Sequence, residues 1–304
     1  LCALQRRVMR HIENCRSATL GGHIRRCESC GYQEVSYNSC RDRHCPKCQS
    51  MARAQWVEAR RAELLPVPYF HVVFTLPHGL NPIAEVSANK PSIYNMLFAA
   101  VSATLKTFGK NPENGLGGRM GFSGILHTWG QQLRTHIHLH CVVPGGALSE
   151  DKTRWISLPR EDFLFPVRAL SKVFRGKFVE ALQRAFQTGQ ITFPAPLAQL
   201  AEPQNLQSLI SKLYQNEWVV YAKKPFGGPE KVLDYLARYT HRVAISNHRI
   251  THLGEGRVSF TYRDRADGGA QKECTLQVSE FIRRFFLFVF PSGLMRIRHF
   301  AFLA

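Results

Sequence analysis

Five of the nine cysteines in this 304-residue chain crowd into residues 27–48, and this cluster limits the possible folds more than any other feature. Two Cys-x-x-Cys pairs, separated by 14 residues, contain Cys27, Cys30, Cys45 and Cys48. A two-residue spacing lets two thiolates reach one ion, so two such pairs can complete a tetrahedral zinc site. An odd number of cysteines argues against a disulfide framework. We therefore expect these four residues to bind a structural Zn²⁺, because four protein ligands leave no position open for water.

The exact ligand set stays open at this point. Cys40 and His44 lie close enough in the sequence to replace one of the predicted ligands. The surrounding segment is basic, and its cationic residues are Arg25, Arg26, Arg41, Arg43, Lys47 and Arg53. These side chains either contact nucleic-acid phosphates or form a solvated surface.

The net charge indicates the kind of partner. The chain carries 40 Lys and Arg residues against 22 Asp and Glu residues, which gives a formal net charge of +18. Such an excess either only aids solubility or serves to bind a polyanion. We favour the polyanion, and nucleic acid is the first candidate.

The composition also excludes two broad classes of protein. A hydrophobic fraction of 44% is ordinary for a globular protein and excludes disorder as the main state. Apolar stretches such as Phe285–Phe290 are far shorter than the roughly 18 residues of a membrane span. No secretion signal is visible, so we expect a cytoplasmic protein without a membrane partner. Because the chain starts at Leu1 within an expected helix, we also expect it to be a piece of a longer protein.

Hydrophobic periodicity and turn residues predict a mixture of helices and strands. Helices are expected at 51–65, 91–108, 169–188, 205–215 and 229–240. Strands are expected at 69–76, 122–129, 136–143, 217–222, 243–251, 256–263 and 273–278. Because the two kinds of element interleave, we predict an α+β fold around a mostly antiparallel sheet with packed helices. We expect a small zinc-binding domain with flanking helices over 1–65 and a second, larger domain over 66–304.

A strand rich in histidine is the next informative feature. Alternation with a period of two places His136, His138 and His140 on one face of the expected strand 136–143. The opposite face is apolar and consists of Ile137, Leu139, Cys141 and Val143. Three histidines in alternation on an otherwise apolar strand either occupy a solvent face or form part of a metal site, and we favour the metal site.

The metal site needs a ligand from another element. His138 and His140 stand close enough on one face to bind a single divalent ion and leave coordination positions open. We expect His127, on the preceding strand, to be the third ligand. Gln131 and His241 are the alternatives.

Two tyrosines lie on the expected helix 229–240. Tyr235 and Tyr239 are four residues apart, so they lie on one helix face, one turn from each other. Arg238, His241 and Arg242 surround them with cationic groups. By themselves, two aromatic residues at this spacing are typical of a helix packed against a sheet.

The order of these three features resembles that of the two-tyrosine HUH endonucleases, and more closely that of the rolling-circle transposases of the insertion-sequence ninety-one family. The resemblance covers nearly the whole chain. Its matching segments are 20–23, 38–48, 70–77, 126–130, 138–146, 235–247 and 296–299. One departure is Phe288, where the family pattern has a histidine.

The resemblance implies a transposase that nicks and rejoins single-stranded DNA in rolling-circle transposition. Tyr235 and Tyr239 would be the nucleophiles, and cleavage would leave a 5′-phosphotyrosine. His138, His140 and His127 would hold a catalytic Mg²⁺ or Mn²⁺, while the cysteines would hold Zn²⁺. The partners would be single-stranded DNA at the element ends and at the target, which places the protein at the bacterial nucleoid. Residues 66–304 would form the catalytic domain.

Two rival functions fit parts of the same pattern. A rolling-circle replication initiator or relaxase would use the same chemistry on different DNA. A non-catalytic, zinc-stabilised DNA-binding protein would use the tyrosines only as core residues.

Aromatic residues that could stack on the bases of a strand are Trp129, Trp218 and Tyr221, although each is individually more typical of a core.

Overall fold

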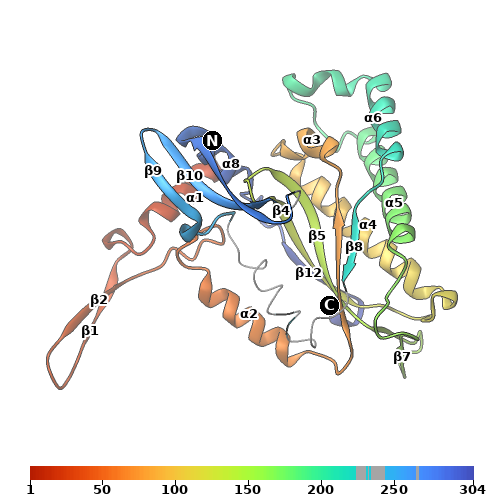
Figure 1. Cartoon of the computed structure of the whole chain (residues 1–304), viewed down its shortest axis with the longest axis horizontal. Coiled ribbons are helices and arrows are strands. Elements are labelled where there is room, and N and C mark those ends of the chain that lie inside the picture. The colour runs from red at the N-terminus through yellow and green to blue at the C-terminus, as the bar shows by residue number, and fades with distance from the viewer. Residues whose placement is uncertain (224–230, 232, 234–243, 265–266) are drawn as a thin grey trace. The chain divides into compact units, whose positions relative to one another are not determined.

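The computed structural model describes residues 1–223, 231, 233, 244–264 and 267–304 (Figure 1). The chain forms two compact units, each assembled from separate segments. Unit 1 contains Leu1–Ala59, Trp129–Arg134 and Ala237–Val289. Unit 2 contains Arg60–Thr128, Thr135–Leu236 and Phe290–Ala304. The division after residue 65 that the sequence suggests stays a prediction.

Unit 2 is built on a five-stranded sheet. In spatial order its strands are β12 (Ile297–Phe300), β4 (Phe122–Trp129), β5 (Thr135–Pro144), β3 (Tyr69–Thr75) and β8 (Val220–Lys223). The pairs β12–β4, β3–β5 and β3–β8 are antiparallel. A small hairpin of β6 (Gly146–Leu148) and β7 (Trp155–Ser157) follows β5 along the chain. This sheet, together with its helices, confirms the predicted α+β class.

The helices of unit 2 pack on the apolar face of the sheet. They are α3 (Asn81–Glu85), α4 (Lys90–Lys110), α5 (Val167–Gln187) and α6 (Pro203–Gln215). The helices α4 and α5 lie side by side (Figure 1). Phe74 of β3 meets Phe174 of α5 edge to face at 5.1 Å between ring centroids. Gly124 of β4 lies so close to Phe98 of α4 that an added Cβ would be 3.3 Å from that ring. These helices bury one face of the sheet, so polar side chains can gather only on the other.

The described residues of unit 1 form two small sheets and three α-helices. A hairpin pairs β1 (Gly22–Arg26) with β2 (Gln33–Tyr37), and a second sheet has the order β11 (Ala270–Gln277), β10 (Arg257–Asp264), β9 (Ile250–Gly254). The helices are α1 (Ala3–Asn14), α2 (Ser50–Ala62), which runs on into unit 2, and α8 (Val278–Leu287).

The helices α1 and α8 share a small apolar core. Val8 packs with Phe286 and Val289. The Gln5 side-chain amide donates to the Phe286 carbonyl at 2.8 Å. Val8 is the buried residue of α1, so this helix contributes little apolar area to folding.

Most of the helices and strands expected from the sequence are confirmed, but the prediction of one strand is wrong. The expected strand 243–251 begins only at Ile250, because Asn247–Arg249 form a 3₁₀ turn first. The Arg249 N–H closes this turn by donating to the Ser246 carbonyl at 3.0 Å, and the Arg249 guanidinium donates to the backbone carbonyls of Thr261 and Gln131. Apart from residues 231 and 233, the expected helix 229–240 lies outside the described residues. Among the helices that the structure describes, none combines the length and apolar character needed to cross a membrane.

Candidate functional site

Three histidines converge on the polar face of the five-stranded sheet. His138 and His140 lie on β5, opposite Thr75 and Val73 of β3, and His127 lies on β4. All three are buried, with exposed fractions of 5–7%. Their candidate ligand atoms lie within 4.8 Å of one another. The structure therefore brings together the three residues that the sequence predicts as metal ligands.

Hydrogen bonds orient the ring of His138. Its Nδ1 lies 2.9 Å from the His136 carbonyl oxygen, so Nδ1 must carry the proton and donate. A neutral His138 then keeps a lone pair on Nε2, which lies 3.0 Å from Nδ1 of His127. This Nε2 atom points at the other candidate ligands and is available to a cation.

A fourth histidine, His71, orients His140 from the neighbouring strand. His71 Nε2 lies 2.8 Å from His140 Nδ1, and the rings stack with centroids 5.1 Å apart at an interplanar angle of 10°. Burial, and to a smaller extent the positive charge of Lys223, lower the pKa of His71 to about 4. A neutral His71 can accept the proton of His140 Nδ1, which leaves His140 Nε2 to bind a cation.

The sequence interpretation missed His71, although a signal for it exists. The strand that contains it reads as a plain apolar run, and its position relative to His140 depends on the β3–β5 register. His71 shares the parity of Val73, the residue paired with His140, so the alternation of β3 places it on the histidine face.

Several other predicted site residues lie elsewhere. The alternative ligand Gln131 belongs to unit 1, where its side-chain oxygen accepts the backbone N–H of Arg263 at 2.8 Å. Tyr235, Tyr239 and the other alternative ligand, His241, lie outside the described residues.

The three candidate stacking aromatics differ in exposure. Trp129 and Trp218 are buried, with 5% and 3% of their surface exposed. Trp129 packs against Phe288 at 5.6 Å, so the residue that departs from the family pattern is part of a core. Tyr221 is half exposed on β8. Only Tyr221 therefore has an aromatic surface that a base could reach.

Four cysteines of unit 1 form a second cluster. The sulfur atoms of Cys15, Cys40, Cys45 and Cys48 lie within 4.8 Å of one another. The Cys40 and Cys48 sulfurs are 3.8 Å apart. Backbone N–H groups point at two of the sulfurs: that of Cys40 at Cys15 and that of Lys47 at Cys45, each at 3.4 Å. Four sulfurs facing one point match the donor set that Zn²⁺ prefers in structural sites.

Two thiols of this cluster, those of Cys40 and Cys45, are hard to ionise without a cation. Burial raises the pKa of Cys40 to about 11 and raises that of Cys45 further. A coordinated cation reverses this effect, because it stabilises the thiolate directly.

The cluster differs from the cysteine set expected from the sequence. Cys45 and Cys48 take part, but Cys27 and Cys30 are exposed residues at the turn of the β1–β2 hairpin. Each strand of this hairpin has five residues, so at about 3.3 Å per residue it carries the first pair about 17 Å from its base. Cys15, far from any Cys-x-x-Cys motif, and Cys40 complete the cluster instead.

The other alternative ligand, His44, has a different role. Its Nδ1 lies 3.0 Å from Asp42 Oδ1, and its backbone N–H donates to the same carboxylate oxygen at 2.9 Å. His11 of α1 binds the second oxygen of Asp42 at 2.8 Å. Asp42 thus ties α1 to the loop that contains the cysteines.

Family models match both parts of the chain. Residues 121–304 match the model described as "Putative transposase", and residues 1–76 match the model described as "Transposase zinc-binding domain". The chain belongs to the transposases of the insertion-sequence ninety-one family.

Two curated relatives are similar over almost the whole chain. "Putative transposase y4qJ" of Sinorhizobium fredii is 52% identical over 303 residues, which are 100% of this chain and 75% of the relative. "Transposase for insertion sequence element IS801" of Pseudomonas savastanoi pv. phaseolicola is 30% identical over 291 residues, or 94% of this chain and 65% of the relative. The chain thus spans 75% and 65% of the lengths of these two proteins.

Solved structures are only distantly similar. The metal-bound structure of the conjugative relaxase TrwC with oriT DNA has 13% sequence identity and a TM-score of 0.30. The likeness covers 57% of this chain and 71% of that chain. A likeness this weak supports no inference about the site.

Proposed function

We propose that this chain is a metal-dependent single-strand DNA endonuclease and strand transferase that acts in rolling-circle transposition. The observation that carries the proposal is the convergence of His127, His138 and His140 on one sheet face in a member of a transposase family. Three buried imidazoles oriented by carbonyl and histidine partners have no evident use in a binding protein without catalysis, whereas they suit a cation with open coordination positions.

The histidine donor set fits a divalent cation. His127, His138 and His140 would hold Mg²⁺ or Mn²⁺, which when bound would polarise the scissile phosphate. His138 and His140 are kept in the ligating tautomer by the His136 carbonyl and by His71. Because the three rings are buried, they lose little orientation when the cation binds.

Tyr235 and Tyr239 are the proposed nucleophiles. The hydroxyl of one tyrosine attacks phosphorus, a new O–P bond forms, and the bond from phosphorus to the 3′ oxygen breaks. The tyrosine gives up its proton, and the departing 3′ oxygen takes one up. The phosphodiester energy is kept in the 5′-phosphotyrosine, so rejoining needs no ATP. Because Tyr235 and Tyr239 stand four residues apart in the sequence, one could hold the first cut end while the other makes the second cut.

The cysteine cluster would hold a structural Zn²⁺. Cys15, Cys40, Cys45 and Cys48 supply four sulfur donors, which leaves no position for water or substrate. The zinc therefore stabilises unit 1 and takes no part in the chemistry.

Formation of a covalent adduct tests the function. The protein is incubated with Mn²⁺ and end-labelled single-stranded DNA that carries the element ends, and a protein–DNA band that resists denaturation is expected. Tyr235→Phe combined with Tyr239→Phe should abolish this band, and so should His138→Ala combined with His140→Ala. His136→Ala is the matched control, because it keeps the carbonyl that orients His138.

Two outcomes would overturn the proposal. Binding of DNA without any adduct under Mg²⁺ or Mn²⁺ would favour a non-catalytic DNA-binding protein. An adduct that survives the double phenylalanine substitution would show that the nucleophiles are assigned wrongly.

A further inference from the structure

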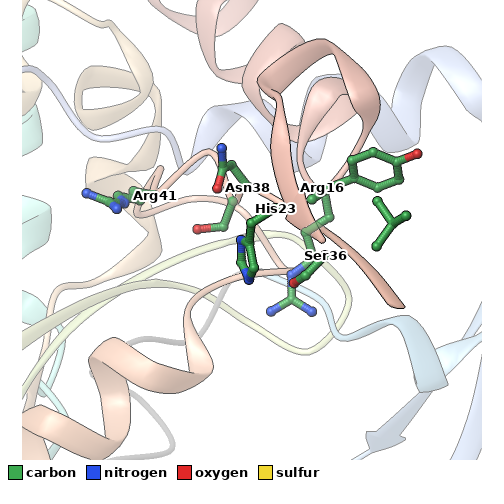
Figure 2. A pocket seen from close by; sticks show the side chains of 8 residues that line it. Arg16, His23, Ser36, Asn38 and Arg41 are labelled. Carbon is green, nitrogen blue, oxygen red and sulfur yellow. The ribbon is translucent and has the colours of Figure 1, made fainter. Parts of the chain in front are cut away.

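A basic pocket lies at the base of the β1–β2 hairpin in unit 1. It has a volume of about 480 Å³ and is lined by Arg16, His23, Val35, Ser36, Tyr37, Asn38, Ser39 and Arg41. In Figure 2, Asn38 lies between Arg41 on one side and His23 and Arg16 on the other. All of these residues come from a stretch of 26 residues, Arg16 to Arg41, so the pocket is local to the segment that the cysteines anchor.

The charge in this pocket is not balanced by the protein. Among the described residues that line it, none is acidic. Neither Arg16 nor Arg41 takes part in an ion pair with any residue that the structure describes. The nearby carboxylates are used elsewhere: Asp42 binds His11 and His44, and Glu34 binds Arg25 at 2.9 Å.

The backbone of both arginines adopts a conformation that is unusual for a residue with a side chain. Arg16 has a φ of 59° and Arg41 a φ of 53°, so both are left-handed. Such a conformation costs of order 1 kcal/mol and persists only where the surroundings impose it. Here the surroundings include the Arg16 N–H, which donates to the Asn38 carbonyl at 3.1 Å.

The cysteine cluster constrains the backbone position from which each of the two arginine side chains extends. Arg16 directly follows Cys15, and Arg41 directly follows Cys40. Two of the four sulfurs that face one another therefore belong to the residues just before the two guanidinium groups. A metal that holds the sulfurs also fixes the spacing between the arginines.

Neutral hydrogen-bonding groups complete the pocket. Ser36, Ser39 and Tyr37, which also line the pocket, carry hydroxyl groups. Asn38 is held in place, because its side-chain amide donates to the Leu20 carbonyl at 3.0 Å and its backbone N–H donates to the Gly21 carbonyl at 3.0 Å. Guanidinium groups and hydroxyls around an open concavity are the groups that contact phosphate oxygens in nucleic-acid complexes.

We propose that this pocket binds the phosphate backbone of the DNA strand on which the protein acts, one phosphate at Arg16 and another at Arg41, and so forms a second DNA contact outside the histidine site. The choice of DNA as the ligand rests on the proposed function. Recognition here is by charge and hydrogen bonding to phosphate, so the contact is independent of base sequence. A metal held by the cysteine cluster would support this contact, because Arg16 and Arg41 directly follow two of the residues that would bind it.

Salt-dependent binding tests this proposal. Arg16→Ala combined with Arg41→Ala is compared with the wild-type chain for binding of two labelled single-stranded oligonucleotides of unrelated sequence. Mg²⁺ and Mn²⁺ are left out, so cleavage does not contribute. Two lost contacts should reduce the slope of log affinity against log salt by about 1.4 and weaken binding about five- to twentyfold, equally for both sequences.

Two further variants separate charge from structure. Arg25→Ala is the matched control, because Arg25 lies on the same hairpin, is exposed and is ion-paired with Glu34. It should leave the slope unchanged. Arg16→Lys combined with Arg41→Lys keeps both charges and should restore most of the binding, even if the alanine pair also loosens the fold.

The outcomes distinguish this proposal from the nuclease assignment. An unchanged slope in the double alanine variant, an equal loss in Arg25→Ala, or a loss confined to one sequence would each overturn the phosphate pocket. Failure to detect a covalent adduct would overturn the nuclease proposal alone, since the binding measurement needs neither tyrosine nor catalytic metal.

Discussion

His71 is the residue on which the orientation of His140 depends. With His71→Ala, Nδ1 of His140 loses the partner that lies 2.8 Å away, so its ring is free to turn and to change tautomer. Loss of such an orienting partner typically weakens metal affinity about 10- to 100-fold. Titration calorimetry with Mn²⁺ should show this loss, and His71→Gln should recover part of it because its amide oxygen can accept the same proton. Equal affinities for the wild-type and alanine proteins would show that His71 is only a core residue.

Glu280 gives a pH-dependent test in unit 1. Hydrogen bonds from Arg283 and, to a smaller extent, from Arg284 lower the pKa of Glu280 to about 2. A carboxyl whose pKa is lowered by folding stabilises the protein above its unfolded pKa of about 4.3, and this contribution disappears as the pH falls toward 2. Because the group is partly exposed, Glu280→Gln should cost less than about 1 kcal/mol at pH 7. Urea unfolding should show that the difference shrinks between pH 5 and pH 3, and a constant difference would contradict the assignment.

At the scale of elements, alternation predicted the histidine strand but could not predict the cysteine cluster. The residues of β5 alternate between histidine and apolar side chains, so one face packs toward α4 and the other carries the imidazoles. The β1–β2 hairpin is almost entirely exposed, so no such alternation marks it. Because the sequence does not reveal this hairpin, its Cys27 and Cys30 look equivalent to Cys45 and Cys48 as zinc ligands. The contribution of Cys15 depends on how α1 is tied to the cysteine loop, which no local spacing encodes.

Tyr221 illustrates what strand register adds to a motif. Val73 of β3 pairs with both His140 and Tyr221, so Tyr221 stands on the histidine face. It lies two strand spacings, about 10 Å, from His140. Half of its surface is exposed. This is a suitable position for a base of the bound strand to stack.

Substitution of Tyr221 tests whether this face binds DNA bases. Tyr221→Ala should weaken binding of a single-stranded oligonucleotide by about 1–3 kcal/mol, the usual value of one stacked base, and Tyr221→Phe should not. Tyr214→Ala is the control, because Tyr214 is similarly exposed but lies on α6 beneath the Arg175 guanidinium. Fluorescence anisotropy measures both. Equal losses in Tyr221→Ala and Tyr214→Ala would exclude a specific stacking role.

At the scale of the whole molecule, the two units differ in what stabilises them. Unit 2 has a buried sheet with large apolar residues such as Phe74, Phe98 and Phe174 at its centre. The N-terminal part of unit 1, up to Cys48, buries few apolar side chains, and the hairpin adds almost none. A segment with so small a core needs a metal or another cross-link to stay folded.

Removal of zinc should therefore unfold one part of the chain selectively. Because four sulfurs meet at the cysteine cluster, chelation leaves residues 1–49 held mainly by the small core around Val8, the Gln5–Phe286 hydrogen bond and the hydrogen bonds of Asp42. Hydrogen exchange with and without a strong chelator should show protection lost in α1, β1 and β2 and kept in β3, β4 and β5. Cys15→Ser should reproduce this loss, whereas Cys27→Ser should not, since Cys27 lies at the exposed turn. If Cys27→Ser released the zinc and Cys15→Ser retained it, the ligand set read from the sequence would replace the one assembled in the structure.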